Sequence, residues 1–155
     1  MLAIRLAKIT DAAAIRELQQ LAFAEEGQRS GTREIPPLLE EVGSIVQHIE
    51  HQIALVALKD ETLVGCVRGV AGDHAYTIRG LTVHPSCQGQ GVGSTLLKAL
   101  EAALPRPTRI DLITNTVMEG NVTFYERHGY RITENTTPVP GITLAHMSKY
   151  LAGAA

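Results

Sequence analysis

The sequence has no tryptophan, only two cysteines, and an aromatic content of 4%. The cysteines, Cys66 and Cys87, are too few for a disulfide framework or a cysteine-based zinc site. No apolar run approaches the roughly 18–20 residues that cross a bilayer, so we expect no transmembrane segment and no membrane partner. Arg5 interrupts the apolar start of the chain, and no secretory signal is expected.

An excess of charge of one sign is also missing. Fourteen lysines and arginines stand against sixteen aspartates and glutamates, and the net charge is −2. Proteins that bind nucleic acids usually carry a basic surface, so this balance predicts no nucleic-acid partner. Hydrophobic residues make up 45% of the 155 residues, enough for the core of one domain. We therefore expect a cytoplasmic, single-domain protein over residues 1–155.

Apolar residues recur with two different periods along the chain. A period of two predicts a strand over residues 2–7. Short segments bounded by turn signals predict further strands over residues 53–58, 63–71, 75–83, 109–114, 130–133 and 142–150. Apolar residues three and four positions apart predict helices over residues 15–22, after an N-cap at Thr10 or Asp11, and over residues 36–49, 94–102 and 119–128. The polar residues 25–32 are expected to form a loop. The resulting order, βααβββαβαββ, predicts an α/β (α+β) fold with a mixed, mostly antiparallel central sheet flanked by helices.

A strand ends at Val83, His84 and Pro85 follow it, and a glycine-rich turn, residues 86–93, then leads into the helix that begins at Ser94. The backbone N–H groups at a helix N-terminus carry partial positive charge, so a turn of this kind favours an anion. Glycines let the backbone approach a phosphate where a Cβ would collide. The alternative is a tight turn whose small residues only allow the helix to pack on the sheet.

Two common phosphate-binding motifs do not fit this turn. A Walker loop needs Gly-Lys-Ser/Thr, but no lysine lies between Lys59 and Lys98. The dinucleotide fingerprint needs a third glycine where Ser94 stands, and the preceding strand belongs to an antiparallel meander. A nucleotide-binding protein of either type is therefore disfavoured.

Two segments carry a resemblance to a known family. Residues 88–93, Gln-Gly-Gln-Gly-Val-Gly, match the signature Gln/Arg-x-x-Gly-x-Gly/Ala, and residues 81–85 directly upstream reinforce the match. Residues 121–130, Asn-Val-Thr-Phe-Tyr-Glu-Arg-His-Gly-Tyr, are similar to the second motif of the same family. From residue 78 to residue 130 the sequence thus resembles the GCN5-related N-acetyltransferase (GNAT) superfamily. The resemblance implies an enzyme that transfers an acetyl group from acetyl-CoA directly to a primary amine of a small molecule, peptide or protein.

The resemblance also implies where acetyl-CoA binds. In this family the turn and the start of the helix hold the pyrophosphate through backbone N–H groups, and the preceding strand pairs with the pantetheine arm. A backbone N–H group of that strand polarises the thioester carbonyl. By this resemblance, the contacts with the cofactor are expected at Leu81, Val83, Gln88, Gly89, Gly91, Gly93, Ser94 and Asn121.

Tyr125 is the catalytic residue that the resemblance implies. Its phenol would protonate the CoA thiolate as it leaves, whereas the structural alternative is an aromatic ring that only packs the helix on the sheet. Many relatives carry a carboxylate where this chain has Arg79 and Gly80. The general base is therefore open, and the candidates are Glu25, Glu26, His74, His84 and a water relay.

The missing strand carboxylate keeps a second function open, namely a non-catalytic acyl-CoA-binding module that acts as a sensor or regulatory subunit. The family often forms homodimers, and the last strand, residues 142–150, is the expected edge for one. The choice of acceptor is expected to depend on residues 23–37. His48 and His51 lie one turn apart without a third ligand, so no metal site is expected.

Overall fold

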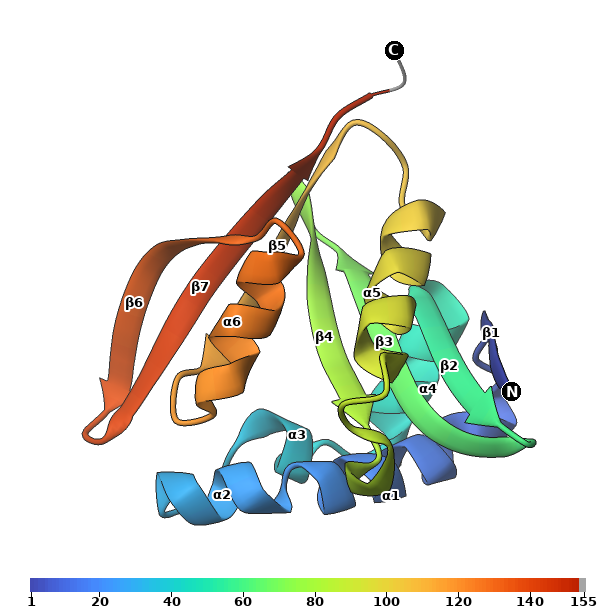
Figure 1. The fold of residues 1–155 in the computed structure, drawn as a ribbon, viewed down its shortest axis with the longest axis horizontal. Coiled ribbons are helices and arrows are strands. Elements are labelled where there is room, and N and C mark those ends of the chain that lie inside the picture. Colours follow the sequence, from blue (N-terminus) through green and yellow to red (C-terminus); the bar gives the residue numbers. More distant parts are fainter. Residues whose placement is uncertain (154–155) are drawn as a thin grey trace.

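The structure is a computed structural model that describes residues 1–153 (Figure 1). A seven-stranded sheet runs through it in the order β1-β2-β3-β4-β5-β7-β6, and only the pair β4–β5 is parallel. The strands are β1 (Leu2–Leu6), β2 (Ile53–Lys59), β3 (Thr62–Ala71), β4 (Ala75–Val83), β5 (Thr108–Asn115), β6 (Arg131–Val139) and β7 (Ile142–Leu151). The helices are α1 (Ala12–Ala22), α2 (Ala24–Ser30), α3 (Pro36–Leu39), α4 (Val42–His51), α5 (Val92–Ala103) and α6 (Glu119–Arg127), with short 3-10 helices η1 (Ile9–Asp11) and η2 (Pro85–Cys87). This is the mixed, mostly antiparallel sheet that the sequence predicts.

Helices cover both faces of the sheet. On one face α5 buries Leu96, Leu97 and Leu100 completely in an apolar cluster with residues of β2 to β5. On the other face α1 and α4 bury Ile15 and Ile45 in a second apolar cluster. Because each such side chain contributes about 1.5–3 kcal/mol when it is fully buried, these clusters hold the sheet between two helical layers.

The sheet divides between β4 and β5. Within residues 1–153 these two strands pair only through Ala75–Thr77 and Arg109–Asp111. Beyond these residues β4 and β5 diverge, and Figure 1 shows the opening as a V whose wide end faces α1 and α2. We call this opening the splay. Because both strands continue past the last pair, each leaves an unpaired edge inside the molecule.

A β-bulge bends β4 along the splay. Cys66 of β3 pairs with Thr82, but Arg68, two residues further on, pairs with Arg79, three residues back. β4 therefore carries one extra residue here, and Gly80 has a φ of 63°, which glycine adopts at little steric cost. Because a bulge bends its strand and increases the local twist, it helps to turn the second half of β4 away from β5.

Two N-terminal segments differ from the prediction. Residues 25–32, expected as a loop, lie mostly in α2. An ion pair between Glu25 and Arg29, one turn apart, stabilises this helix, and Gly31 ends it with a φ of 74°. The helix expected over residues 36–49 is divided into α3 and α4, because Glu40 between them has an extended backbone conformation.

The C-terminal strands differ as well. β6 continues to Val139, so it is longer than the expected strand over residues 130–133. β7 pairs with β5 on one side and with β6 on the other. The expectation that residues 142–150 form the edge of the sheet is therefore wrong, and the edge strand is β6. The last strand is an edge only when neighbouring strands follow the chain order, and here β7 inserts between β5 and β6.

Cys66 and Cys87 are both free and buried. No three His, Cys, Asp or Glu side chains within residues 1–153 gather closely enough to hold a metal ion. None of the helices described is long and apolar enough to cross a membrane.

Candidate active site

The N-terminus of α5 presents backbone N–H groups that no side chain caps. Gly91, at the N-cap position, has a φ of 83°, and Gly89 has a φ of 77°. A Cβ at either glycine would meet no other atom within 4 Å, so the turn is open on this side. The turn thus combines free donors, the partial positive charge of a helix N-terminus and room for a phosphate group.

Lys59 adds a full positive charge beside this turn. Its Nζ lies 3.4 Å from Oε1 of Gln90, which stands 31 residues later in the chain. Gln88 fastens the turn to the strand before it, because its Nε2 donates to the carbonyl of Val83 at 3.4 Å. Sequence reasoning missed Lys59, since only the folding of β2 brings the end of that strand to the turn.

The second half of β4 offers main-chain groups to the splay. The N–H group of His84 donates to the carbonyl of Val64 in β3 at 2.7 Å. Consecutive residues of a strand point their N–H groups to opposite sides, so those of Val83 and Leu81 point away from β3. Both residues that the sequence predicts as pantetheine contacts therefore present main-chain groups to the splay.

Strand β4 and helices α5 and α6 meet at Gly93. A Cβ at this position would lie 3.5 Å from the ring of Phe124 and 3.6 Å from the side chain of Val83. A second contact between the two helices joins Ser94 Oγ to His128 Nε2 at 2.9 Å. The two segments that carry the family resemblance, which are separate in the sequence, thus lie side by side.

Tyr125 lies on α6, next to this contact. Its ring packs edge-on against Phe124 and Tyr130, with centroid distances of 5.2 Å and 5.8 Å. Burial alone raises the pKa of its hydroxyl well above the usual value for tyrosine. A phenol with a raised pKa is protonated at neutral pH, as a general acid must be. Tyr130 is not equivalent, because its hydroxyl donates to Oε2 of Glu101 at 2.7 Å in the core.

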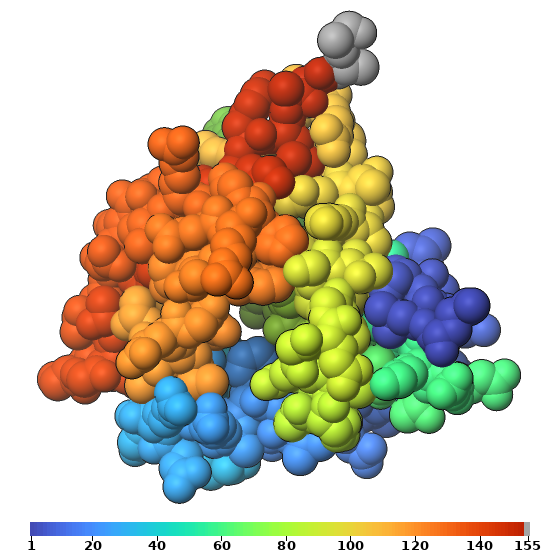
Figure 2. All heavy atoms as spheres, in the orientation of Figure 1, coloured from blue at the N-terminus to red at the C-terminus, as the bar shows by residue number. Residues whose placement is uncertain are grey.

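A hollow lies between α6 and the start of α5. Figure 2 shows it between the orange atoms of α6 and the yellow-green atoms of the turn before α5, with blue atoms of the N-terminal helices below. Asn121 lies on α6, one turn before Tyr125, and is half-buried. A surface depression of about 520 Å³ on α6 is lined by Glu119, Gly120, Thr123, Phe124 and Arg127.

Among the candidate bases, Glu26 is the carboxylate that the fold buries at the wide end of the splay. Its residue is 8% exposed, on α2. Burial raises the pKa of Glu26, and the nearby side chain of Asn115, the last residue of β5, partly offsets this effect. Glu25 is exposed and pairs with Arg29 instead. A carboxylate with a raised pKa is a stronger base than an ordinary one, which favours Glu26.

The two candidate histidines lie in less suitable places. His74 precedes β4, so the length of that strand, about 30 Å at its usual rise per residue, separates it from the turn at Val83. His84 lies in the turn itself, where its Nδ1 accepts from the N–H group of Ser86 at 3.1 Å. Its ring thus stabilises the turn.

Comparison with known proteins relates both the sequence and the fold to one family. The family described as "Acetyltransferase (GNAT) domain" matches residues 50–132, more than half of the chain. The crystal structure of the ribosomal-protein-S18-alanine N-acetyltransferase from Escherichia coli is 17% identical in sequence and has a TM-score of 0.80. That match covers 100% of this chain and 97% of the other. A search of curated proteins finds no match.

Two further structures with this fold contain a form of coenzyme A. The structure of yncA from Salmonella typhimurium with acetyl-CoA is 18% identical, has a TM-score of 0.76, and covers 100% of this chain and 96% of its own. An aminoglycoside 6'-N-acetyltransferase complexed with coenzyme A is 18% identical, has a TM-score of 0.75, and covers 99% of both chains. At these identities the similarity establishes the fold.

Proposed function

The chain belongs to the GNAT acetyltransferase family, and we propose that it transfers an acetyl group from acetyl-CoA directly to a primary amine of a small molecule, peptide or protein. Acetyl-CoA is the cosubstrate. We propose that residues 1–155 form one acetyltransferase domain. The observation that most directly supports this function is the meeting, at Gly93, of the uncapped N-terminus of α5, the unpaired edge of β4 and the helix that carries Tyr125.

The residues at the start of α5 fit the anionic part of acetyl-CoA. Donors here are main-chain dipoles, so a net charge of −2 for the whole chain is no obstacle to a polyanion. Lys59 adds one positive charge at the same turn. The proposed pyrophosphate contacts are the main-chain N–H groups of Gln88, Gly89, Gly91, Gly93 and Ser94.

The proposed chemistry assigns one role to each group at the splay. Acetyl-CoA supplies a thioester carbonyl as the electrophile and a thiolate as the leaving group. The N–H groups of Leu81 and Val83 hold the pantetheine arm with Asn121, and one of them donates to the thioester oxygen as negative charge develops there. Tyr125 donates its proton to the sulfur as the carbon–sulfur bond breaks, and Glu26 takes a proton from the attacking amine.

Measurement of thiol release tests this function with a panel of amines. We expect the wild type to release CoA with at least one amine, and Tyr125→Phe to lower kcat by about 10²-fold, the usual contribution of a general acid. Tyr150→Phe is the matched control, because it also removes one tyrosine hydroxyl, but from a side chain that is 64% exposed and outside the site. Equal rates for Tyr125→Phe and the wild type would exclude Tyr125 from the mechanism.

The same experiment separates the enzyme from its main alternative. If calorimetry shows that CoA binds but no amine is acetylated, the chain is better explained as a non-catalytic acyl-CoA-binding module. We also propose a cytoplasmic location, where free thiols such as those of Cys66 and Cys87 persist. A homodimer is a further proposal from the family resemblance, which sedimentation velocity tests.

A further inference from the structure

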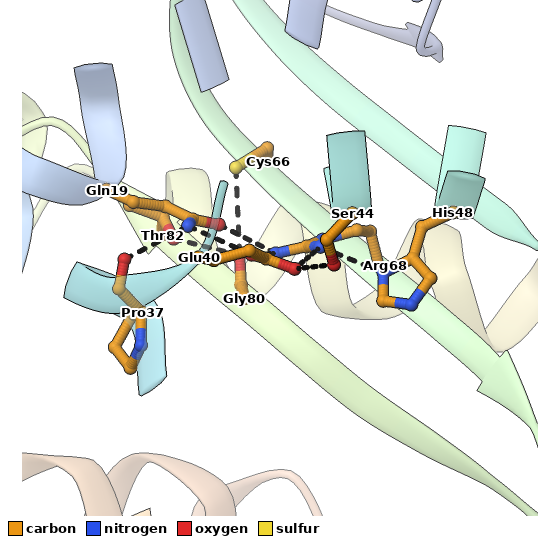
Figure 3. A network of polar contacts seen from close by, with 9 residues as sticks. All are labelled: Gln19, Pro37, Glu40, Ser44, His48, Cys66, Arg68, Gly80 and Thr82. Atoms are coloured by element: carbon orange, nitrogen blue, oxygen red, sulfur yellow. Dashed lines mark hydrogen bonds and ion pairs between the residues drawn. The ribbon is translucent and has the colours of Figure 1, made fainter. Parts of the chain in front are cut away.

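Arg68 is a charged side chain buried under the sheet face that α1 and α4 cover. It is 3% exposed, and its guanidinium donates to both carboxylate oxygens of Glu40, from Nη1 at 2.8 Å and from Nη2 at 2.7 Å (Figure 3). Nη2 also donates to Oε1 of Gln19 at 2.7 Å, and Nη1 lies 2.9 Å from Nδ1 of His48. One guanidinium therefore contacts α1, α4 and the segment between α3 and α4.

The same guanidinium packs against the bulge of β4. A Cβ added to Gly80 would collide with Nη2 of Arg68 and would lie 3.1 Å from Oε1 of Gln19. The carbonyl of Gly80 accepts a hydrogen bond of 2.8 Å from the hydroxyl of Thr82, which holds the bulge in shape. We call Arg68, Glu40, Gln19 and Gly80 the bulge clamp.

The bulge clamp requires a break in the helical segment between α3 and α4. Glu40 interrupts the helical segment with φ −66° and ψ 127°, and its carboxylate thereby reaches Arg68. Gln19, which is fully buried, donates to the carbonyl of Pro37 at 3.2 Å and to Oε1 of Glu40 at 3.1 Å. Nε of Arg68 is buried and has no hydrogen-bond partner among residues 1–153.

Stability alone does not account for a buried ion pair of this kind. Taking two charges out of water costs several kcal/mol per ion, and apolar side chains of similar volume are often at least as stabilising. The unpaired Nε adds a further cost, because a buried donor without a partner loses its bonds to water. What the pair adds over an apolar core is direction, since two parallel hydrogen bonds fix the orientation of both groups.

The place of the bulge clamp shows what that orientation controls. Leu81 directly follows Gly80, and its N–H group points into the splay. Given the acetyl transfer proposed above, on which this inference rests, we propose that Arg68 and Glu40 are positioning residues of the active site. They fix the β4 bulge against α1, α4 and the segment between α3 and α4, so that the Leu81 N–H group keeps a set position relative to these elements.

Glu40→Gln tests this inference through the pattern of kinetic constants. The expected result is a kcat lowered by about 10-fold or more and a raised KM for the amine, because a misplacement of about 1 Å in an active site can cost 10²-fold in rate. The Kd of CoA, measured by calorimetry, should rise by less than the KM for the amine, since the proposed pyrophosphate contacts at residues 88–94 lie outside the clamp and only the pantetheine contact of Leu81 is disturbed. Glu41→Gln is the matched control, because this neighbouring carboxylate is exposed.

A second variant separates positioning from a loss of stability. The double variant Arg68→Met with Glu40→Leu replaces the ion pair with apolar side chains and is expected to recover the melting temperature lost in Glu40→Gln. Its kcat and its amine KM should stay impaired, because the fixed orientation is not restored. Wild-type kinetic constants in the double variant, or in Glu40→Gln, would overturn the inference.

A third measurement does not depend on turnover. In ¹H–¹⁵N spectra, the amide signals of residues 80–83 should move in Glu40→Gln and stay in place in Glu41→Gln. Unmoved signals would refute the bulge clamp, even if the wild type acetylates no amine in the panel. The absence of turnover in the wild type, by contrast, would count against the proposed function alone.

Discussion

The ion pair between Arg68 and Glu40 predicts how the stability of this protein depends on pH. Burial alone would raise the pKa of Glu40, but the hydrogen bonds and charge of Arg68, with smaller contributions from Ser44 and Gln19, outweigh it and lower the pKa from 4.5 to about 2. At 1.36 kcal/mol for each pKa unit, this difference corresponds to about 3 kcal/mol of folding free energy.

The sign of the effect follows from the lowered pKa. Because the carboxyl group is more acidic in the folded chain, its ionised form stabilises the fold fully above pH 4.5, its value in the unfolded chain. This contribution is lost progressively as the pH falls from 4.5 towards 2. Glu40→Gln imitates the protonated carboxyl group, so the variant should lack this part of the pH dependence altogether.

Urea unfolding, followed by circular dichroism at several pH values between 7 and 2, measures this contribution. At pH 7 we expect Glu40→Gln to unfold with about 3 kcal/mol less free energy than the wild type, which lowers the melting temperature by about 10 °C for a chain of this size. Near pH 2 the two curves should approach each other, whereas Glu41→Gln should follow the wild type throughout. Parallel curves for the wild type and Glu40→Gln would refute the reasoning.

The other predictions concern the candidate active site. Glu26→Gln should lower kcat/KM by about 10²-fold and abolish the acidic limb of the pH–rate profile, in which the wild-type rate rises with pH as the carboxyl group of raised pKa ionises; a retained acidic limb would assign the base elsewhere. Gly91→Ala should destabilise the fold by about 1–2 kcal/mol and weaken the binding of CoA, because its φ is 83° although the space around it is open. Gly43→Ala, in the helix α4 and with equally open space, should be neutral or stabilising, and calorimetry of CoA binding with thermal melting compares the two variants.

Much of the fold could be predicted from the sequence where the apolar residues form a strong local pattern and turn residues mark its ends. The three strands from residue 53 to residue 83 and the helix after the glycine-rich turn end within one or two residues of the prediction. Helix α2 could not be predicted in this way, because its polar residues carry no helical apolar period. The helix is packed instead through contacts with residues further along the chain. Gly27 lies so close to Leu38 that an added Cβ would be 2.9 Å from the Leu38 side chain.

In the candidate site, too, local features could be predicted from the sequence and contacts between distant residues could not. The turn of residues 88–94 and Tyr125 follow from local motifs, and the structure brings these two segments together at Gly93. The sequence alone does not favour Glu26 over Glu25. Neighbouring residues of one helix point in different directions, and in the fold only Glu26 is buried. The ion pair of Glu40 with Arg68 could not be predicted from the sequence either. The two residues are 28 positions apart, and nothing in the sequence around Arg68 indicates that it is buried.

The splay leaves the sheet in two parts, β1 to β4 and β5 to β6, that are joined through Ala75–Thr77 and Arg109–Asp111. Past these pairs the inner edge of β4 has main-chain donors and acceptors that the fold itself does not pair with β5. In the proposed function, the pantetheine arm of acetyl-CoA takes those hydrogen bonds in the manner of an additional short strand. The cosubstrate is then a temporary part of the architecture, and every catalytic cycle builds and dismantles a piece of β-sheet.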